Sequence, residues 1–311
     1  MLFRSAHVQA LSGEYLDSLD IADAGLAKAR ETQSLVVYLS SLSSKSLALI
    51  HLGRWGELRR VLEHGIELAE KNGNDPWAGI FRAMLAWLHM QSCDFDEARR
   101  LAEEILLTHT EEPAGQAQCI ALLTAGYSDL ATGQPAASLP VFMKVRDRQS
   151  KPKVFLQWYW RMISEFGIVG ALLESGDLEK AQAAAEQFQK ESDGTADPAL
   201  RSPAWDTLAR VAAAKGDLPR ALECANRAIA EMKGFELPSV AWRVHSTASW
   251  LNARAGDRKL AGEHRLKAGK ALLMVANSYE KNDPLRQALE SAAQALNTKL
   301  DREIDAVPAG D

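Results

Sequence analysis

The stretch Glu174-Ser-Gly-Asp-Leu-Glu-Lys-Ala181 decides the fold, because related stretches recur at a regular spacing along the chain. In each copy a turn residue, glycine in all but one, is followed five positions later by a small or aliphatic residue. The turn residues lie at positions 13, 53, 93, 133, 176, 216 and 256, so the interval is 40 residues everywhere except for one interval of 43. Such a period is typical of a solenoid, in which each repeat packs only on its neighbours.

Each period predicts two antiparallel helices, named here helix A before the turn and helix B after it. In the copy around Gly176, apolar residues recur at three- and four-residue spacing on both sides of the turn. Clusters that contain proline, such as Asp193-Gly-Thr-Ala-Asp-Pro198, separate one period from the next. The predicted fold class is all-α, with a single repeat domain over residues 1–300.

Small residues predict where helices A and B touch. Six residues lie seven positions before a turn residue, and all but Val169 are small: Ser46, Ala86, Gly126, Val169, Ala209 and Ser249. Small side chains let two helices approach closely, and the residue five positions after the turn is expected to do the same from helix B.

This framework resembles the tetratricopeptide (TPR) repeat, which also has a small residue in helix A, a turn glycine and an alanine early in helix B. A TPR unit has about 34 residues, whereas these units have about 40. The resemblance implies a right-handed superhelix of about seven TPR-like hairpins, with a concave face formed by successive A helices. Longer units of this kind are similar to the C-terminal repeat arrays of bacterial multidomain signalling ATPases, among them adenylate-cyclase and MalT-like regulators.

The two ends of the array are predicted to differ. Residues 284–300 form an amphipathic pattern with Asp283 as N-cap and Pro284 at the first helical position, which predicts a capping helix. Residues 301–311 are expected to be a disordered tail. Only twelve residues precede Gly13, so the first repeat is expected to be truncated, either within a larger protein or covered by a second copy in a homo-oligomer. The alternative is that a short first helix suffices.

The composition limits which partners and which cellular location we expect. The net charge of −5 provides no overall attraction for nucleic acid or an anionic membrane, and neither a signal peptide nor an 18-residue apolar run occurs. The three cysteines are too irregularly spaced for a disulfide framework or a zinc site. We therefore expect a cytoplasmic protein without cofactor or metal that binds neither nucleic acid nor membrane.

Candidate binding residues follow from the presumed concave face. Several residues six positions before a turn residue are aromatic or basic, and two arginines share a helix face with Trp250. Together they predict a groove that binds an extended peptide with a carboxylate. These candidates are Trp87, Tyr127, Arg210, Arg243, Trp250 and Arg254. The alternative is that the aromatic residues fill gaps between repeats while the arginines are solvated.

The single period of 43 residues contains a secondary basic and aromatic candidate site. Its members are Lys151, Lys153, Trp158 and Arg161. Basic residues interleaved with aromatic ones can bind a phosphorylated ligand or single-stranded nucleic acid. The alternative is a solvated helix end, where cations complement the helix dipole.

No catalytic motif is present: the sequence lacks G-x-S-x-G, H-E-x-x-H, a P-loop and a dinucleotide-binding G-x-G-x-x-G. The leading hypothesis is a non-enzymatic scaffold that binds a peptide or partner domain on its concave face, as the sensor part of a bacterial signalling protein. Two alternatives are a MalT-like domain that senses a small-molecule effector and a structural oligomerisation module.

Overall fold

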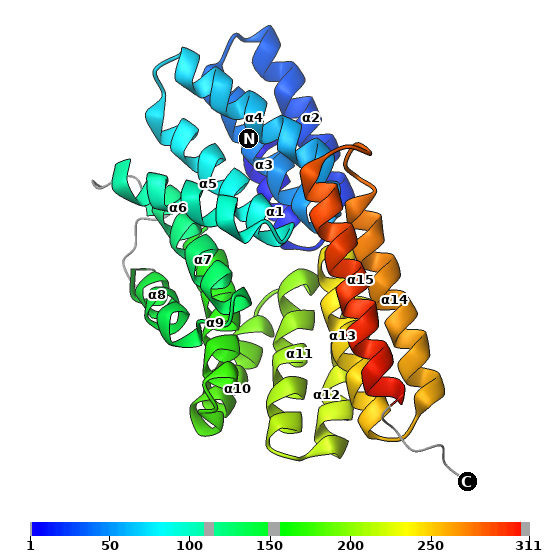
Figure 1. Cartoon of the computed structure of the whole chain (residues 1–311). Helices are drawn as coiled ribbons and strands as arrows, with labels where there is room; N and C mark the ends of the chain where they lie inside the picture. Colours follow the sequence, from blue (N-terminus) through cyan, green and yellow to red (C-terminus); the bar gives the residue numbers. More distant parts are fainter. Residues whose placement is uncertain (1, 109–114, 149–155, 306–311) are drawn as a thin grey trace.

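The computed structural model describes residues 2–108, 115–148 and 156–305, and these residues contain helices but no strand. The helices follow the predicted A and B alternation along the whole chain (Figure 1). Their bounds are α1 (Leu2–Leu11), α2 (Tyr15–Glu31), α3 (Leu35–His51), α4 (Trp55–Lys71), α5 (Asp75–Gln91), α6 (Phe95–Thr108), α7 (Gly115–Ala131), α8 (Pro135–Arg148), α9 (Gln157–Glu174), α10 (Leu178–Ser192), α11 (Pro198–Ala214), α12 (Leu218–Glu231), α13 (Pro238–Arg254), α14 (Arg258–Ala276) and α15 (Pro284–Asp305).

All seven predicted turn residues adopt the left-handed backbone conformation. The six glycines have φ between 68° and 87°, and Cys93 takes the same conformation at φ 65°. In the later repeats the aspartate after the glycine caps helix B, as Asp257 does by accepting a hydrogen bond from the backbone N–H of Leu260 at 2.9 Å. Gly-Asp therefore ends one helix and starts the next, which explains why the pair recurs.

The small residues lie where the prediction placed them. All six residues seven positions before a turn residue are buried, and so are the small residues five positions after it. Gly126 shows the reason: an added Cβ there would come within 2.8 Å of the Phe142 ring on the paired helix. Close packing of helices A and B is thus confirmed.

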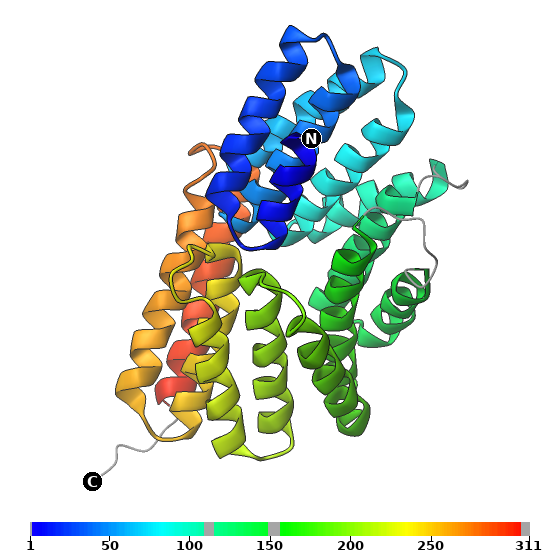
Figure 2. The same ribbon diagram turned by 180° about the vertical axis from the view of Figure 1, so that it is seen from behind.

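The hairpins wind into a superhelix whose ends meet. In Figures 1 and 2 the helices α1–α4 lie against the start of α11, the start of α13 and the loop between α14 and α15, although these segments are far apart in the sequence. An added Cβ at Gly13 would lie 2.5 Å from Pro198, and one at Gly53 would lie 2.5 Å from Pro238. Both contacts join residues 185 positions apart, so one superhelical turn rests directly on the next.

We call this line of contacts between the two superhelical turns the seam. Its first rung joins Leu11 and Tyr15 to the loop before α11, and its second joins the end of α3 to the start of α13. The third rung joins α4 and the turn after α5 to the loop between α14 and α15. The seam was not predicted from the sequence.

The C-terminal helix is longer than predicted. It starts at Pro284 as expected, but it continues through Asp305, so the prediction that the tail begins at residue 301 is wrong for residues 301–305. The extension is held by the buried side chain of Leu300 and by an ion pair of 2.9 Å between Arg265 and Asp301. The remainder of the predicted tail lies outside the described residues.

The first helix is short, with ten residues, yet it is packed. Ser18 Oγ donates a hydrogen bond to the Ala6 carbonyl at 2.8 Å, and Ala6 and Ala10 are buried. None of the helices that the structure describes is both long and apolar enough to cross a bilayer.

Candidate functional site

A cavity of about 110 Å³ lies inside the superhelix, between the A helices of both turns. It is enclosed mainly by aromatic and aliphatic side chains, with a few polar groups. Its lining residues are Ile50, His51, Trp87, Met90, Gln91, Tyr127, Tyr159, Met162, Ile163, Phe166, Phe188, Ala199, Leu200, Pro203, Ser239, Val240 and Arg243. Apolar walls with few polar groups are typical of ligand sites, although drug-sized ligands need about 300–1,000 Å³.

The aromatic wall is packed and hydrogen-bonded. The Trp87 and Tyr127 rings meet edge to face with centroids 5.4 Å apart, and the Tyr127 hydroxyl donates to the Ile163 carbonyl at 2.6 Å. Trp87 is only 8% exposed. These residues therefore fill the space between repeats, as the alternative hypothesis expected, and they also line the cavity.

Arg243 is the cationic group of the cavity. Its guanidinium donates to the Gln91 side-chain oxygen at 2.8 Å and to the Ser239 carbonyl at 3.2 Å, and it stacks on Trp242 at 4.5 Å. Within residues 2–108, 115–148 and 156–305, its two hydrogen bonds thus go to neutral acceptors, and the nearby carboxyl group of Asp206 acts on it through its charge. Burial lowers the pKa of Arg243, because the charged form loses its hydration. A guanidinium with neutral partners and unused donors is suited to bind a carboxylate.

A polar cluster at the first rung of the seam adjoins the cavity. Tyr15 donates to Asp197 at 2.5 Å, and the same carboxylate oxygen caps α11 by accepting from the Ala199 N–H at 2.9 Å. The His51 ring stacks on Tyr15 with centroids 4.9 Å apart and is hydrogen-bonded to the Tyr159 hydroxyl at 3.0 Å. The second oxygen of Asp197 is buried without a partner in the part of the chain that the structure describes.

Burial shifts the proton affinities of this cluster. Loss of hydration raises the pKa of Asp197 to about 7 and lowers the pKa of His51 to about 4. The seam consequently contains a neutral histidine and a carboxyl group that titrates close to neutral pH.

In the variant Asp197→Asn, the free energy of unfolding is expected to lose the part of its pH dependence that comes from Asp197. The raised pKa means that the folded state holds the proton more tightly than the unfolded state, whose aspartate pKa is about 3.9. The stabilisation that Asp197 gives by binding a proton is therefore fully present below about pH 4 and is lost as the pH rises through about 7. The free energy of unfolding should fall by on the order of 4 kcal/mol over this range. The asparagine still accepts from Tyr15 and Ala199.

Urea unfolding of both proteins between pH 4.5 and 8.5 tests this expectation. The free energy of unfolding of the wild type minus that of the variant should decrease with rising pH and level off above about 8. His51 is present in both proteins and its pKa is shifted by burial, not by the charge of Asp197, so its titration contributes to both curves alike. Parallel curves would contradict the assignment of the titrating group.

A second, more open pocket of about 470 Å³ continues along the same inner helix faces. Arg210 and Trp250 line it together with Glu174 and residues of α15. On α9, α11 and α13 alike, residues of the N-terminal half line the cavity, and residues from the middle of the helix to its C-terminal end line this pocket. Between them lies buried Asp206, one oxygen of which has no partner among the described residues. Burial raises the pKa of Asp206 to about 6.

The predicted groove residues are thus divided among three places. Trp87, Tyr127 and Arg243 line the cavity, whereas Arg210 and Trp250 line the second pocket. Arg254 lines neither of these two pockets and stacks on Trp250 at 5.2 Å.

The two secondary candidate residues that the structure describes, Trp158 and Arg161, do not line the cavity. Trp158 is 36% exposed at the start of α9, and Arg161 forms an ion pair with Glu191. Lys151 and Lys153 lie outside the described residues. Within those residues, no group of three histidine, cysteine, aspartate or glutamate side chains is arranged to hold a metal ion.

The sequence prediction did not include several wall residues. Arg243 lies thirteen positions before its turn residue, whereas Tyr159, Ala199 and Ser239 each lie seventeen positions before theirs, one helical turn further along the same helix face. Extending the candidate positions by one helical turn would have found them. His51 and Gln91 lie two positions before their turn residues, a position that the prediction included through Arg254, although neither was named as a candidate; in the structure they contact Tyr159 and Arg243.

Comparison with known proteins reveals the fold but no family. No family model matches the sequence, and no curated protein matches it. Among solved structures, a Rap protein complexed with competence and sporulation factor has a TM-score of 0.66 at 12% identity, over 98% of this chain and 91% of that chain. The apo form of RapI has a TM-score of 0.50 at 10% identity, over 98% and 97%.

A chain of the APC/C hetero-tetramer Cut9–Hcn1 is also similar, with a TM-score of 0.62 at 13% identity over 99% of this chain. The present chain spans 55% of that chain. The fold is a TPR-like array. At such low identity the similarity extends to the fold alone, and the resemblance to MalT-like signalling ATPases stays a prediction.

Proposed function

We propose that this protein is a non-enzymatic interaction scaffold that binds a peptide or a segment of a partner protein on the inner face of its superhelix. The observation that carries the proposal is Arg243, a partly buried guanidinium whose hydrogen bonds go to neutral acceptors beside an aromatic cavity. A carboxylate would satisfy its charge, and an apolar side chain of the same ligand would fill the cavity.

The similar solved structures favour a binding role over a catalytic one. In two of the similar structures the TPR-like protein is held with another molecule, competence and sporulation factor in one and Hcn1 in the other. Among the described residues of the cavity, the Tyr159 hydroxyl contacts His51, but burial raises the pKa of Tyr159 and lowers the pKa of His51 to about 4, so the hydroxyl is a poor nucleophile and the imidazole a weak base. We also propose, from the resemblance of its repeats, that the chain is the regulatory part of a bacterial signalling protein.

The variant Arg243→Ala is expected to weaken peptide binding by about tenfold to a hundredfold, which corresponds to loss of a charged hydrogen bond of about 1.5–3 kcal/mol. The test begins with selection of random peptides on the wild-type protein, followed by measurement of Kd for the recovered peptides. Arg254→Ala is a matched control, because Arg254 lies on the same helix and also stacks on a tryptophan but does not line the cavity. Equal losses in both variants, or in neither, would refute the proposed site.

A second candidate function is sensing of a small molecule, and the size of the cavity favours it. About 110 Å³ holds one side chain or a small acid rather than a folded element. Thermal-shift screening with small aromatic carboxylates distinguishes this candidate, since a sensor should be stabilised by a free acid without any peptide.

A third candidate is oligomerisation through the first repeat. The exposed apolar side chains Val8 and Leu16 on α1 and α2 favour this role. Light scattering of the wild type and of Val8→Glu/Leu16→Glu tests it, because only the wild type should then associate.

A further inference from the structure

The cavity is built from both sides of the seam. His51 and Gln91 come from the C-terminal ends of α3 and α5, whereas Ser239 and Arg243 come from α13 on the next superhelical turn. These two groups of residues face one another only while the turns are in contact. The complete cavity therefore exists only in the closed superhelix.

Two hydrogen bonds connect cavity residues across the seam. Arg243 donates to Gln91 at 2.8 Å, and Ser239 Oγ donates to the His51 carbonyl at 3.1 Å. Gln91 is neutral, so it orients the guanidinium without neutralising it. It acts as a positioning residue for whatever anion Arg243 binds, and it does so only when the seam is closed.

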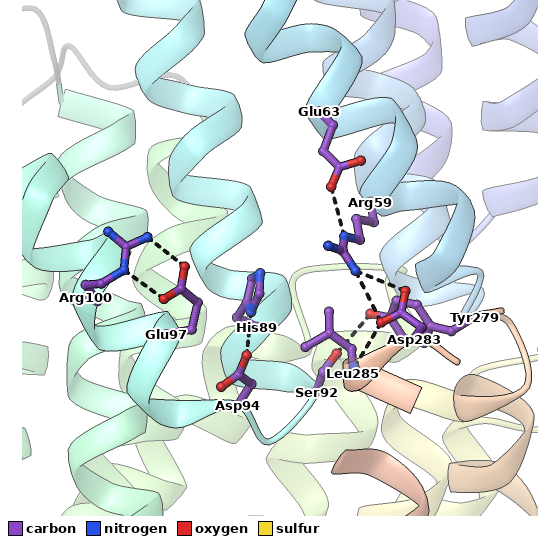
Figure 3. A network of polar contacts seen from close by, with 10 residues as sticks. All are labelled: Arg59, Glu63, His89, Ser92, Asp94, Glu97, Arg100, Tyr279, Asp283 and Leu285. Carbon is purple, nitrogen blue, oxygen red and sulfur yellow. Dashed lines mark hydrogen bonds and ion pairs between the residues drawn. The ribbon is translucent and has the colours of Figure 1, made fainter. Parts of the chain in front are cut away.

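The third rung lies outside the cavity and is mostly polar. Figure 3 shows Arg59 of α4 in contact with Asp283, and Ser92 in contact with Tyr279; the distances are 3.0 Å in both pairs. Partly exposed ion pairs contribute little to stability. Such contacts can break and form again without unfolding the repeats.

We propose that the seam is a ligand-linked latch, in which occupation of the cavity and closure of the seam stabilise each other. This inference rests on the proposed function, because it concerns the same cavity and an anionic ligand at Arg243. The ligand contacts both superhelical turns in the closed state and only one in the open state. By linkage, anything that opens the seam weakens ligand binding, and the ligand protects the seam from opening.

The amide of Gly56 is a natural reporter of closure. It lies in the first turn of α4, where backbone N–H groups have no acceptor within the helix. Its hydrogen bond goes across the seam to Ser278 Oγ at 3.1 Å, and Gly56 does not line the cavity. Hydrogen exchange of this one amide thus measures how often the third rung is open.

The experiment uses 3-phenylpropanoate as the probe, since it combines an aromatic ring with a carboxylate, and 3-phenylpropanol as its uncharged control. At ten times the probe's Kd, exchange at Gly56 should slow by about tenfold, because a ligand that binds only the closed state reduces opening by that factor. The alcohol at the same concentration should leave the exchange nearly unchanged.

Two variants make the test specific. Asp283→Asn keeps the cap on the Leu285 N–H but removes the ion pair with Arg59, so exchange at Gly56 should rise about twofold to fivefold. Glu63→Gln removes only the pair within α4 and should leave exchange at the wild-type rate. If the probe binds the wild type but Gly56 exchanges at the same rate with and without it, the latch is refuted and the proposed binding site stands. If millimolar probe does not bind the wild type, both are refuted.

Discussion

Replacing Gly56 by alanine is expected to force the seam open at its third rung and to lower the free energy of unfolding by about 3 kcal/mol. An added Cβ would lie 2.1 Å from the Ser278 carbonyl oxygen and 3.1 Å from the Tyr279 Cα. Both atoms belong to the backbone and cannot rotate away, so the loop between α14 and α15 has to move. Urea unfolding measures the loss, and small-angle scattering should show a larger radius of gyration.

Gly262→Ala is the control for this prediction. Gly262 also lies within a helix, but nothing would meet its Cβ within 4 Å. Alanine there should stabilise the protein by about 0.5–1 kcal/mol through helix propensity. A Gly56→Ala protein as stable and compact as the wild type would show that the two superhelical turns do not depend on this contact.

Replacing Phe142 by alanine is expected to destabilise the protein by about 3–5 kcal/mol. The ring is fully buried on α8 and packs against Tyr127 with centroids 4.8 Å apart. The ring lies directly against Gly126 and Gly167, since an added Cβ at either would come within 2.8 Å of it. Glycine has no side chain that could move into the space that the ring leaves. The cavity left behind cannot collapse, which places the expected cost near the upper end of the range.

Met143→Ala, one position later on the same helix, is the matched control. Its side chain is 39% exposed, so the change should cost about 0.5 kcal/mol or less. Thermal or urea unfolding of both variants gives the comparison. Equal effects of the two substitutions would mean that α8 is not anchored through Phe142.

The local structure was predictable because it depends on local sequence. The period located all seven turns, and it did so even at Cys93, where a cysteine occupies the left-handed position that glycine usually takes. The small residues located the contacts between helices A and B, since close helix packing excludes large side chains at those positions. Only the length of α15 was misjudged, because the buried position of Leu300 depends on the helices beside it.

The candidate site was predictable only in part. Trp87, Tyr127 and Arg243 were identified because they follow the repeat register on the inner face of the A helices. The same register also selected Arg254, which lies outside the cavity. Register identifies the face of a helix, but whether a side chain on that face lines a cavity depends on what packs opposite to it.

The sequence by itself determined the repeat, the turns and the inner helix faces, because each of these follows from contacts within a period of 40 residues. Only the tertiary structure decided that Gly13 meets Pro198, that Gly53 meets Pro238, and that Gln91 meets Arg243. These contacts depend on the small rotation from one hairpin to the next, summed over a full superhelical turn. Slight differences in packing at each step change that sum, so neither the seam nor the cavity behind it can be read from any single repeat.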